Sequence, residues 1–169
     1  CFLGVAILGV VPGIIASVGV ALAAFVWRAW RPYHAVLGRV EGVKGYHDVT
    51  RYPDARRIPG LVLFRWDAPL FFANSMIFRN RVRELVAAAD PPAHWVVVAA
   101  EPITDIDTTA AEQLLLLIEQ LEGRSARLVF AELKDPVKRR LRDYGLAERI
   151  GDGGFYPTVG TAVAAYVRE

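Results

Sequence analysis

The chain opens with an apolar stretch, residues 1–27, in which no side chain is charged, and all 20 basic and 18 acidic residues follow it. As one helix the stretch would be about 40 Å long, enough to cross a hydrocarbon core of about 30 Å. Pro12-Gly13 interrupts the pattern, and pieces divided there would be only about 17 Å and about 21 Å long. We therefore expect either one kinked membrane helix or two short membrane segments.

Beyond residue 33 the apolar positions switch repeatedly between strand-like and helix-like spacing. Short runs rich in β-branched residues predict strands at 35–40, 46–49, 61–66, 94–100 and 126–131. Longer stretches with a period near 3.6 predict helices at about 74–89, 110–122, 135–144 and 158–167; Asn74 or Ser75 would cap the first, and Asp135 the third. A strand pair followed by alternating helices and strands indicates an α/β fold with a mixed, mostly parallel sheet covered by helices.

The junction between the two parts carries aromatic and basic residues at 27, 28, 30, 31 and 33. Such a belt is typical of a membrane interface, and Arg28 with Arg31 predicts that this end is cytoplasmic. Residues 28–60 have seven basic and three acidic side chains, a net charge of +4, whereas residues 61–169 have a net charge of −2. This distribution fits a membrane flank and not a nucleic acid-binding surface. We divide the chain into residues 1–32, the membrane segments with a linker, and residues 33–169, a cytoplasmic domain.

A polar loop at residues 101–109 follows the most apolar strand and precedes a leucine-rich helix. Its Asp105, Asp107, Thr108 and Thr109 stand where open α/β sheets place ligand or partner sites, so we take them as the candidate regulatory or ligand-binding residues. The alternative is structural: Asp107, Thr108 or Thr109 caps the helix.

Leu116 lies on the polar side of that helix, between glutamate and glutamine positions. We expect it to be exposed. It is either a lone surface leucine or a contact for a membrane domain or partner protein.

Catalytic chemistry finds little support in the sequence. Asp105-x-Asp107-x-Thr109 matches a phosphoaspartyl hydrolase pattern, in which the first aspartate is the nucleophile and Mg²⁺ neutralises the phosphate. Residues 101–104, however, separate the motif from the strand end, and a later Asp-Asp pair is lacking. The single Cys1 excludes an internal disulfide, and no Cys/His spacing indicates zinc. We predict a protein that is not an enzyme and has no metal site.

Several stretches, in this order, resemble one family: residues 2–4, 8–14, 27–28 with 31–32, 37–40, 52–55, 67–74 and 105–110. The first three resemble the end of the membrane domain of SulP-type anion transporters, and the others the STAS domain that follows it. The resemblance implies a STAS-like fold, a dimeric transporter in the cell (inner) membrane, and sulfate or a related anion as substrate. The anion site would lie in membrane helices that this sequence does not include. A membrane-anchored STAS module without a transport role is the alternative.

The same resemblance implies a regulatory role for the loop. In anti-sigma-factor antagonists of the STAS fold, a serine at the position of Thr109 accepts phosphate and switches binding to a partner. Here threonine replaces that serine and Ala110 replaces the usual glycine. Some STAS domains also look able to bind nucleotides, and the resemblance implies that a purine nucleotide (GTP, GDP or ATP) could bind in the cleft near this loop. A cytosolic regulatory protein is a further implied partner.

Overall fold

The computed structural model describes residues 2, 6 and 9–169, with the backbone alone at positions 28 and 29. It consists of two compact units, Cys1–Pro32 and Tyr33–Glu169, which we describe separately.

The first unit contains helix α2, Val10–Trp30, which is continuous over 21 residues. Pro12 is its third residue, in the first turn, where a backbone N–H would lack a helical partner anyway. The Gly13 N–H bonds to the Gly9 carbonyl oxygen at 3.0 Å. The interruption that we expected at Pro12-Gly13 is therefore the start of a helix and not a break within one. The segment before Gly9, where a further helix was expected, lies largely outside the described residues.

Within the part of the chain that the structure describes, Val10–Trp27 is the one stretch long and apolar enough to cross a membrane. Only 6% of it is buried. Exposed apolar side chains along a helix of this length favour a lipid or protein environment over water.

The second unit is built on a six-stranded sheet in the order β2-β1-β3-β4-β5-β6. Strand β1 (His34–Arg39) is antiparallel to β2 (Tyr46–Asp48) and to β3 (Leu61–Trp66). Strands β3, β4 (Trp95–Ala99), β5 (Arg127–Ala131) and β6 (Phe155–Tyr156) are all parallel. The predicted mixed, mostly parallel α/β sheet is thus confirmed.

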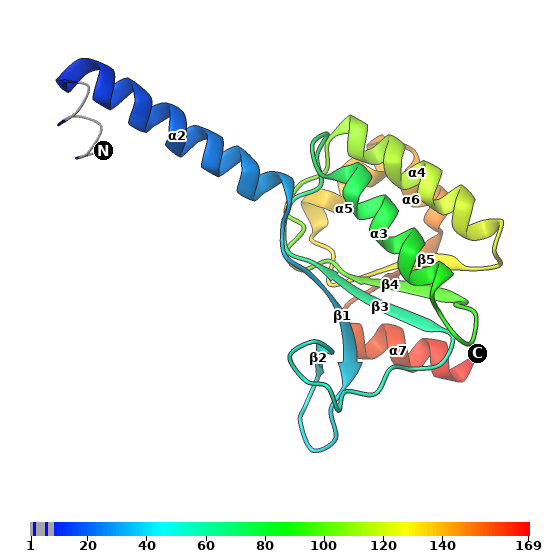
Figure 1. Ribbon diagram of the computed structural model, residues 1–169. Coiled ribbons are helices and arrows are strands. Elements are labelled where there is room, and N and C mark those ends of the chain that lie inside the picture. The colour runs from blue at the N-terminus through cyan, green and yellow to red at the C-terminus, as the bar shows by residue number, and fades with distance from the viewer. Residues whose placement is uncertain (1, 3–5, 7–8) are drawn as a thin grey trace. The chain divides into compact units, whose positions relative to one another are not determined.

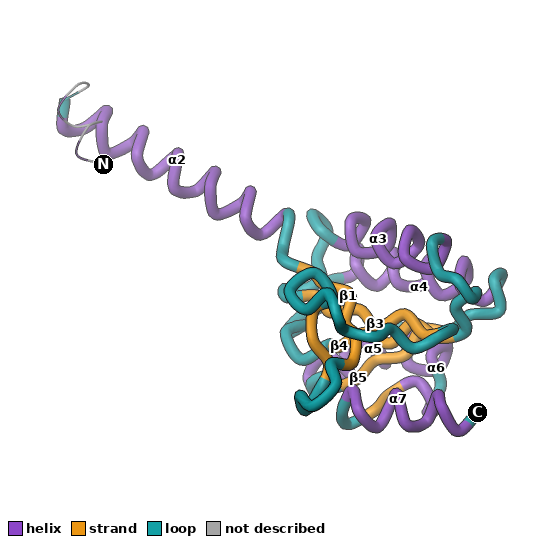
Figure 2. Tube along the Cα trace, turned by 60° about the horizontal axis from the view of Figure 1, so that its bottom comes forward, coloured by secondary structure: helices purple, strands orange, loops and turns teal. Residues whose placement is uncertain are grey.

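The two faces of this sheet are covered unequally (Figures 1 and 2). One face packs against α3 (Ser75–Ala87), α4 (Thr108–Glu122), α5 (Asp135–Asp143) and α6 (Leu146–Ile150) in a large core that includes Phe64, Val98 and Phe130. The other face packs against α7 alone (Val159–Arg168), around Leu63, Val97 and Val129. Helix α7 lies against β4, β5 and β6. The same face of β1 and β3 therefore lacks a covering helix among the described residues.

Helix starts differ in detail from the expectations. Asn74 does hold the N-cap position of α3, but its side-chain amide bonds back to the preceding loop. The N-cap of α5 is Lys134, so our assignment of Asp135 was wrong; Asp135 is the first helical residue and Pro136 the second. Pro136 still occupies the first turn, where proline is tolerated. Thr158 caps α7 through a reciprocal pair of bonds with Thr161.

Candidate functional site

The loop at residues 101–109 is fixed to the segment that precedes α3. The Leu70 N–H bonds to the Asp105 carbonyl oxygen at 2.9 Å, and the Asp107 N–H bonds to the Leu70 carbonyl oxygen at 3.2 Å. Leu70, Ile103 and Ile106 are fully buried beneath this bridge. The loop is thus an integral part of the fold, with apolar anchors on its inner side.

Asp107 is the N-cap of α4 and serves two segments at once. One carboxylate oxygen accepts the Ala110 N–H at 2.7 Å and the other accepts the Phe72 N–H at 2.8 Å. The predicted capping role is confirmed for Asp107. Because both oxygens hold backbone donors, Asp107 is poorly suited to act as a general acid.

Asp105 faces α5 and pairs with Arg140. Its carboxylate also accepts the Ile106 N–H at 2.7 Å, and the Arg140 guanidinium lies 3.4 Å from the Ile106 carbonyl oxygen. Both side chains of the pair are about half exposed. The charge of Asp105 is therefore already balanced by a residue 35 positions later in the chain.

Thr108 and Thr109 are the first two residues of α4, and both are exposed. A phosphate there would gain from the helix dipole and would lose from the two nearby carboxylates. Further along α4, Leu116 is 40% exposed, as expected, and its neighbour Leu115 is 39% exposed. Phosphorylation of the threonines and an interface at Leu116 stay predictions.

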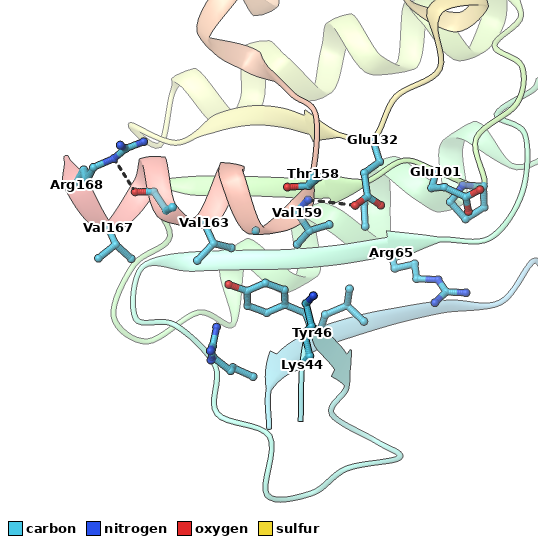
Figure 3. A pocket seen from close by; sticks show the side chains of 17 residues that line it. Lys44, Tyr46, Arg65, Glu101, Glu132, Thr158, Val159, Val163, Val167 and Arg168 are labelled. Atoms are coloured by element: carbon cyan, nitrogen blue, oxygen red, sulfur yellow. Dashed lines mark hydrogen bonds between the residues drawn. The ribbon is translucent and has the colours of Figure 1, made fainter. Parts of the chain in front are cut away.

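A groove of about 980 Å³ lies on the other face of the sheet, between the β1–β2 hairpin and α7. Its apolar lining includes Leu37 and Ala99 on the floor that the sheet forms, and Val163 of α7 on the wall beside it. In Figure 3, Lys44 and Tyr46 approach from the hairpin side, Val167 and Arg168 lie at one end, and Arg65 and Glu101 lie at the other.

The strand register explains how the hairpin contributes to this groove. Side chains alternate along a strand, so Ala35, Leu37 and Arg39 of β1 share one face. Arg39 pairs with Tyr46 across the hairpin, and directly opposed residues in an antiparallel pair point to the same side. The sheet thus presents an arginine and a tyrosine beside its own apolar floor.

The charges in the groove divide into satisfied and unsatisfied groups. Arg65 forms two bonds with Asp67, at 2.6 and 2.9 Å, and this pairing raises the pKa of Arg65. The Glu132 carboxylate accepts the Val159 N–H at 3.3 Å, at the N-terminus of α7. Arg39 and Lys44, by contrast, have no carboxylate partner within the described chain. Arg39 and Lys44 are therefore available to an anion.

Helix α7, which forms one wall of the groove, is held at both ends. Its first turn is closed by the Thr158–Thr161 bonds and by Glu132. Near its end the Tyr166 hydroxyl donates to the Pro59 carbonyl oxygen at 2.8 Å, and Glu169 binds Arg127 at 2.6 Å and the Trp95 indole N–H at 3.0 Å. The position of this wall is therefore fixed by bonds within the domain.

Tyr33, the first residue of the domain, is held by a side-chain hydrogen bond. The Tyr33 hydroxyl donates to the Asp48 carboxylate, which in addition accepts the Thr50 N–H at 2.8 Å. The Thr50 hydroxyl and then Tyr33 lower the pKa of Asp48, and the bond to Asp48 raises the pKa of Tyr33.

Comparison with known families decides what kind of domain this is. The family model for the STAS domain matches residues 52–162. The chain belongs to the STAS-domain family.

Relatives and solved structures extend this assignment. A probable sulfate transporter of Mycobacterium tuberculosis is 37% identical over 162 residues, which cover 96% of this chain and 29% of the relative. The murine solute carrier 26 family member A9 anion transporter has a similar fold, with a TM-score of 0.80 and 19% identity over 93% of this chain and 26% of that one. The STAS domain of a SulP transporter from Vibrio cholerae gives a TM-score of 0.56 and 16% identity, over 71% of this chain and 91% of that domain. This chain thus spans less than a third of its curated relative.

In this STAS domain, sequence reasoning found the loop but not the groove. The loop is contiguous, so its polar composition is visible in the sequence. The groove is lined by residues from position 37 to position 168, contributed by separate segments. The basic excess near the start of the domain was the one available signal, since Arg39 and Lys44 belong to it.

The hydrolase hypothesis requires Mg²⁺ beside Asp105 and Asp107. Across the described residues, no three His, Cys, Asp or Glu side chains gather as metal ligands. The residues around Asp105 and Asp107 instead form a helix cap and an ion pair.

Proposed function

We propose that this chain is the STAS-domain part of a SulP-type sulfate transporter, together with the end of its membrane domain. In this proposal α2 belongs to the membrane domain, and Tyr33–Glu169 is a cytoplasmic regulatory and interaction module without catalytic activity. Sulfate or a related inorganic anion would be moved by membrane helices outside this sequence.

One observation carries the proposal more than any other. The match to the mycobacterial probable sulfate transporter covers 96% of the chain, so only about seven of the 169 residues lie outside it. It must therefore include most of α2 as well as the STAS domain. A similarity restricted to the soluble domain would favour an unrelated membrane-anchored module equally well.

The position of basic residues supports the orientation. Arg31 directly follows α2, and Arg28 is near its end in the sequence. Basic residues flanking a membrane helix favour the cytoplasmic side. We accordingly place the domain in the cytoplasm beneath the inner membrane, in a homodimeric transporter.

Transport of labelled sulfate tests the proposal. The full-length protein that contains this chain is reconstituted in liposomes, and uptake of radiolabelled sulfate is measured with and without residues 33–169. We expect uptake by the full-length protein and an altered rate for the truncated one. Absence of uptake of sulfate and of other inorganic anions by a folded full-length protein would contradict the proposal. It would favour the anchored module, as would a coding sequence without further apolar spans upstream of Cys1.

For the regulatory signal we propose a purine nucleotide or phosphate at the loop. Thr108 and Thr109 are exposed at a helix N-terminus, a position that favours phosphate oxygens. Titration of residues 33–169 with GDP, GTP and ATP should shift the amide resonances of residues 105–110. Unchanged spectra at millimolar nucleotide would exclude a nucleotide at this loop. We also propose that the exposed Leu116 contacts a cytosolic partner protein. The variant Leu116→Asp should bind such a partner more weakly than the parent domain does.

A further inference from the structure

The groove beside α7 combines three features that are not found together at the loop. Helix α7, one of its walls, is held by internal bonds, its floor is apolar, and Arg39 and Lys44 beside it have no carboxylate partner within the described residues. Its volume of about 980 Å³ is at the upper end of the range for small-molecule sites, about 300–1,000 Å³. Sites of this kind usually pair an apolar surface with a few polar groups that fix the orientation of the ligand.

The apolar floor requires the apolar part of a ligand. Leu37 and Val163 are buried members of the second core, and Val167 beside them is 68% exposed. Tyr46 adds a partly buried aromatic ring from the hairpin. A small inorganic anion such as free sulfate could not cover these groups.

Arg39 and Lys44, which no carboxylate pairs within the described residues, favour a ligand with an anionic group at their end of the groove. Arg39 is at the end of β1 away from Arg65, since Ala35 and not Arg39 pairs with Arg65. Lys44 belongs to the same hairpin, and Figure 3 shows it beside Tyr46. The opposite end holds Glu101 and Glu132. Glu101 lies 3.9 Å from the Lys134 ammonium, whereas Glu132 has no cationic partner within the described residues, so its carboxylate would repel an anion and favour one orientation.

We propose that this groove binds an amphipathic organic anion. Its apolar body lies on Leu37, Tyr46 and Val163, and its sulfate, sulfonate, phosphate or carboxylate group lies at Arg39 and Lys44. The site is distinct from the loop at residues 101–109. The inference does not rest on the transport proposal, because a STAS domain of any membrane protein could carry such a site.

Fluorescence titration of residues 33–169 with anilinonaphthalene sulfonate tests the proposal. This unit has its own two cores, and its fold resembles a STAS domain solved by itself. We expect saturable binding that Arg39→Glu combined with Lys44→Glu weakens by about tenfold to a hundredfold, the loss expected for two charge-assisted contacts. Val167→Asp, at an exposed position on the groove wall, should weaken it as well. Arg83→Glu is the matched control, since Arg83 is an exposed basic residue of α3 on the other face of the sheet.

Competition identifies the class of anion and can overturn the proposal. Displacement of the dye by octyl sulfate would indicate an acyl or aryl anion, and displacement by GDP would indicate a nucleotide; either supports an amphipathic anion in this groove. Displacement by inorganic sulfate at the same concentration would show that the floor plays no part, which contradicts the proposal. Equal binding by the double variant and the Arg83→Glu control, with circular dichroism showing both folded, would also overturn it.

Discussion

The loop at residues 101–109 and the groove beside α7 differ in how their charged groups are used. Asp107 holds two backbone N–H groups, and Asp105 is paired with Arg140. In the groove, Arg39 and Lys44 have no such partner within the described residues. The loop is dense in oxygen-bearing side chains, yet its aspartates are occupied by structural bonds. A high density of polar residues in a sequence therefore does not measure how many of them are available to a ligand.

Substitution of Asp107 should cause the largest change in stability that distinguishes the loop from the groove. Asp107→Ala removes the cap of α4 and the acceptor for the Phe72 N–H, so we expect the free energy of unfolding of residues 33–169 to fall by about 2 kcal/mol. Urea denaturation measures this change. Thr108→Ala, at the next position, should change stability by less than about 0.5 kcal/mol. Equal losses for the two variants would show that Asp107 is not the structural element of the loop.

The ion pair between Asp105 and Arg140 should contribute less. Because both side chains are about half exposed, solvent screens their attraction. A double-mutant cycle with Asp105→Ala and Arg140→Ala should give a coupling energy of about 0.5–1 kcal/mol. The coupling should decrease in high salt. A coupling near zero would mean that Asp105 is free to act on a ligand, and the contrast between loop and groove would weaken.

The dependence of stability on acid pH tests Asp48, which lies near the start of the domain and belongs neither to the loop nor to the groove lining. The bonds from Thr50 and Tyr33 hold the pKa of Asp48 below its ordinary value of 3.8. A carboxylate with a depressed folded-state pKa stabilises the fold above its unfolded-state pKa, and this contribution is lost as pH falls through the folded-state value. The difference in melting temperature between the parent domain and Asp48→Asn should thus be largest near neutral pH and should shrink below about pH 4. A difference independent of pH would contradict this account of Asp48.

The smallest change in stability should come from the groove. Arg39→Glu with Lys44→Glu breaks no ion pair within the described residues, so the free energy of unfolding should change by less than about 0.5 kcal/mol, again measured by urea denaturation. A loss of about 2 kcal/mol or more would assign these residues a structural role and remove the difference between the two regions.

Much of the fold could be predicted because its elements are long or strongly apolar. Strand β4 is buried at all five positions, and its sequence is apolar throughout. Strand β6, helix α6 and the 3₁₀ helix η1 (Asp152–Gly154) are two to five residues long, too short to show a period. Pro12-Gly13 was expected either to kink one helix or to divide it in two, because the sequence alone does not show where the helix begins. Asp135 was chosen as a cap from its side chain, but Lys134 has the extended backbone of that position.

The candidate site was predicted only where it is local. Asp107 and Ala110 are three positions apart, a spacing that indicates a cap. Arg140 is 35 positions from Asp105, and nothing in the sequence pairs them. The groove depends on strand register and on where α7 packs, which are properties of the assembled sheet.

Two-dimensional ¹H–¹⁵N spectra of residues 33–169 during titration with anilinonaphthalene sulfonate test the central distinction most directly. If the groove is the available site, the amides of Arg39, Lys44, Tyr46 and Gly160 shift with saturation, and those of residues 104–110 keep their positions. Shifts confined to residues 104–110, with the hairpin and α7 unchanged, would contradict the account.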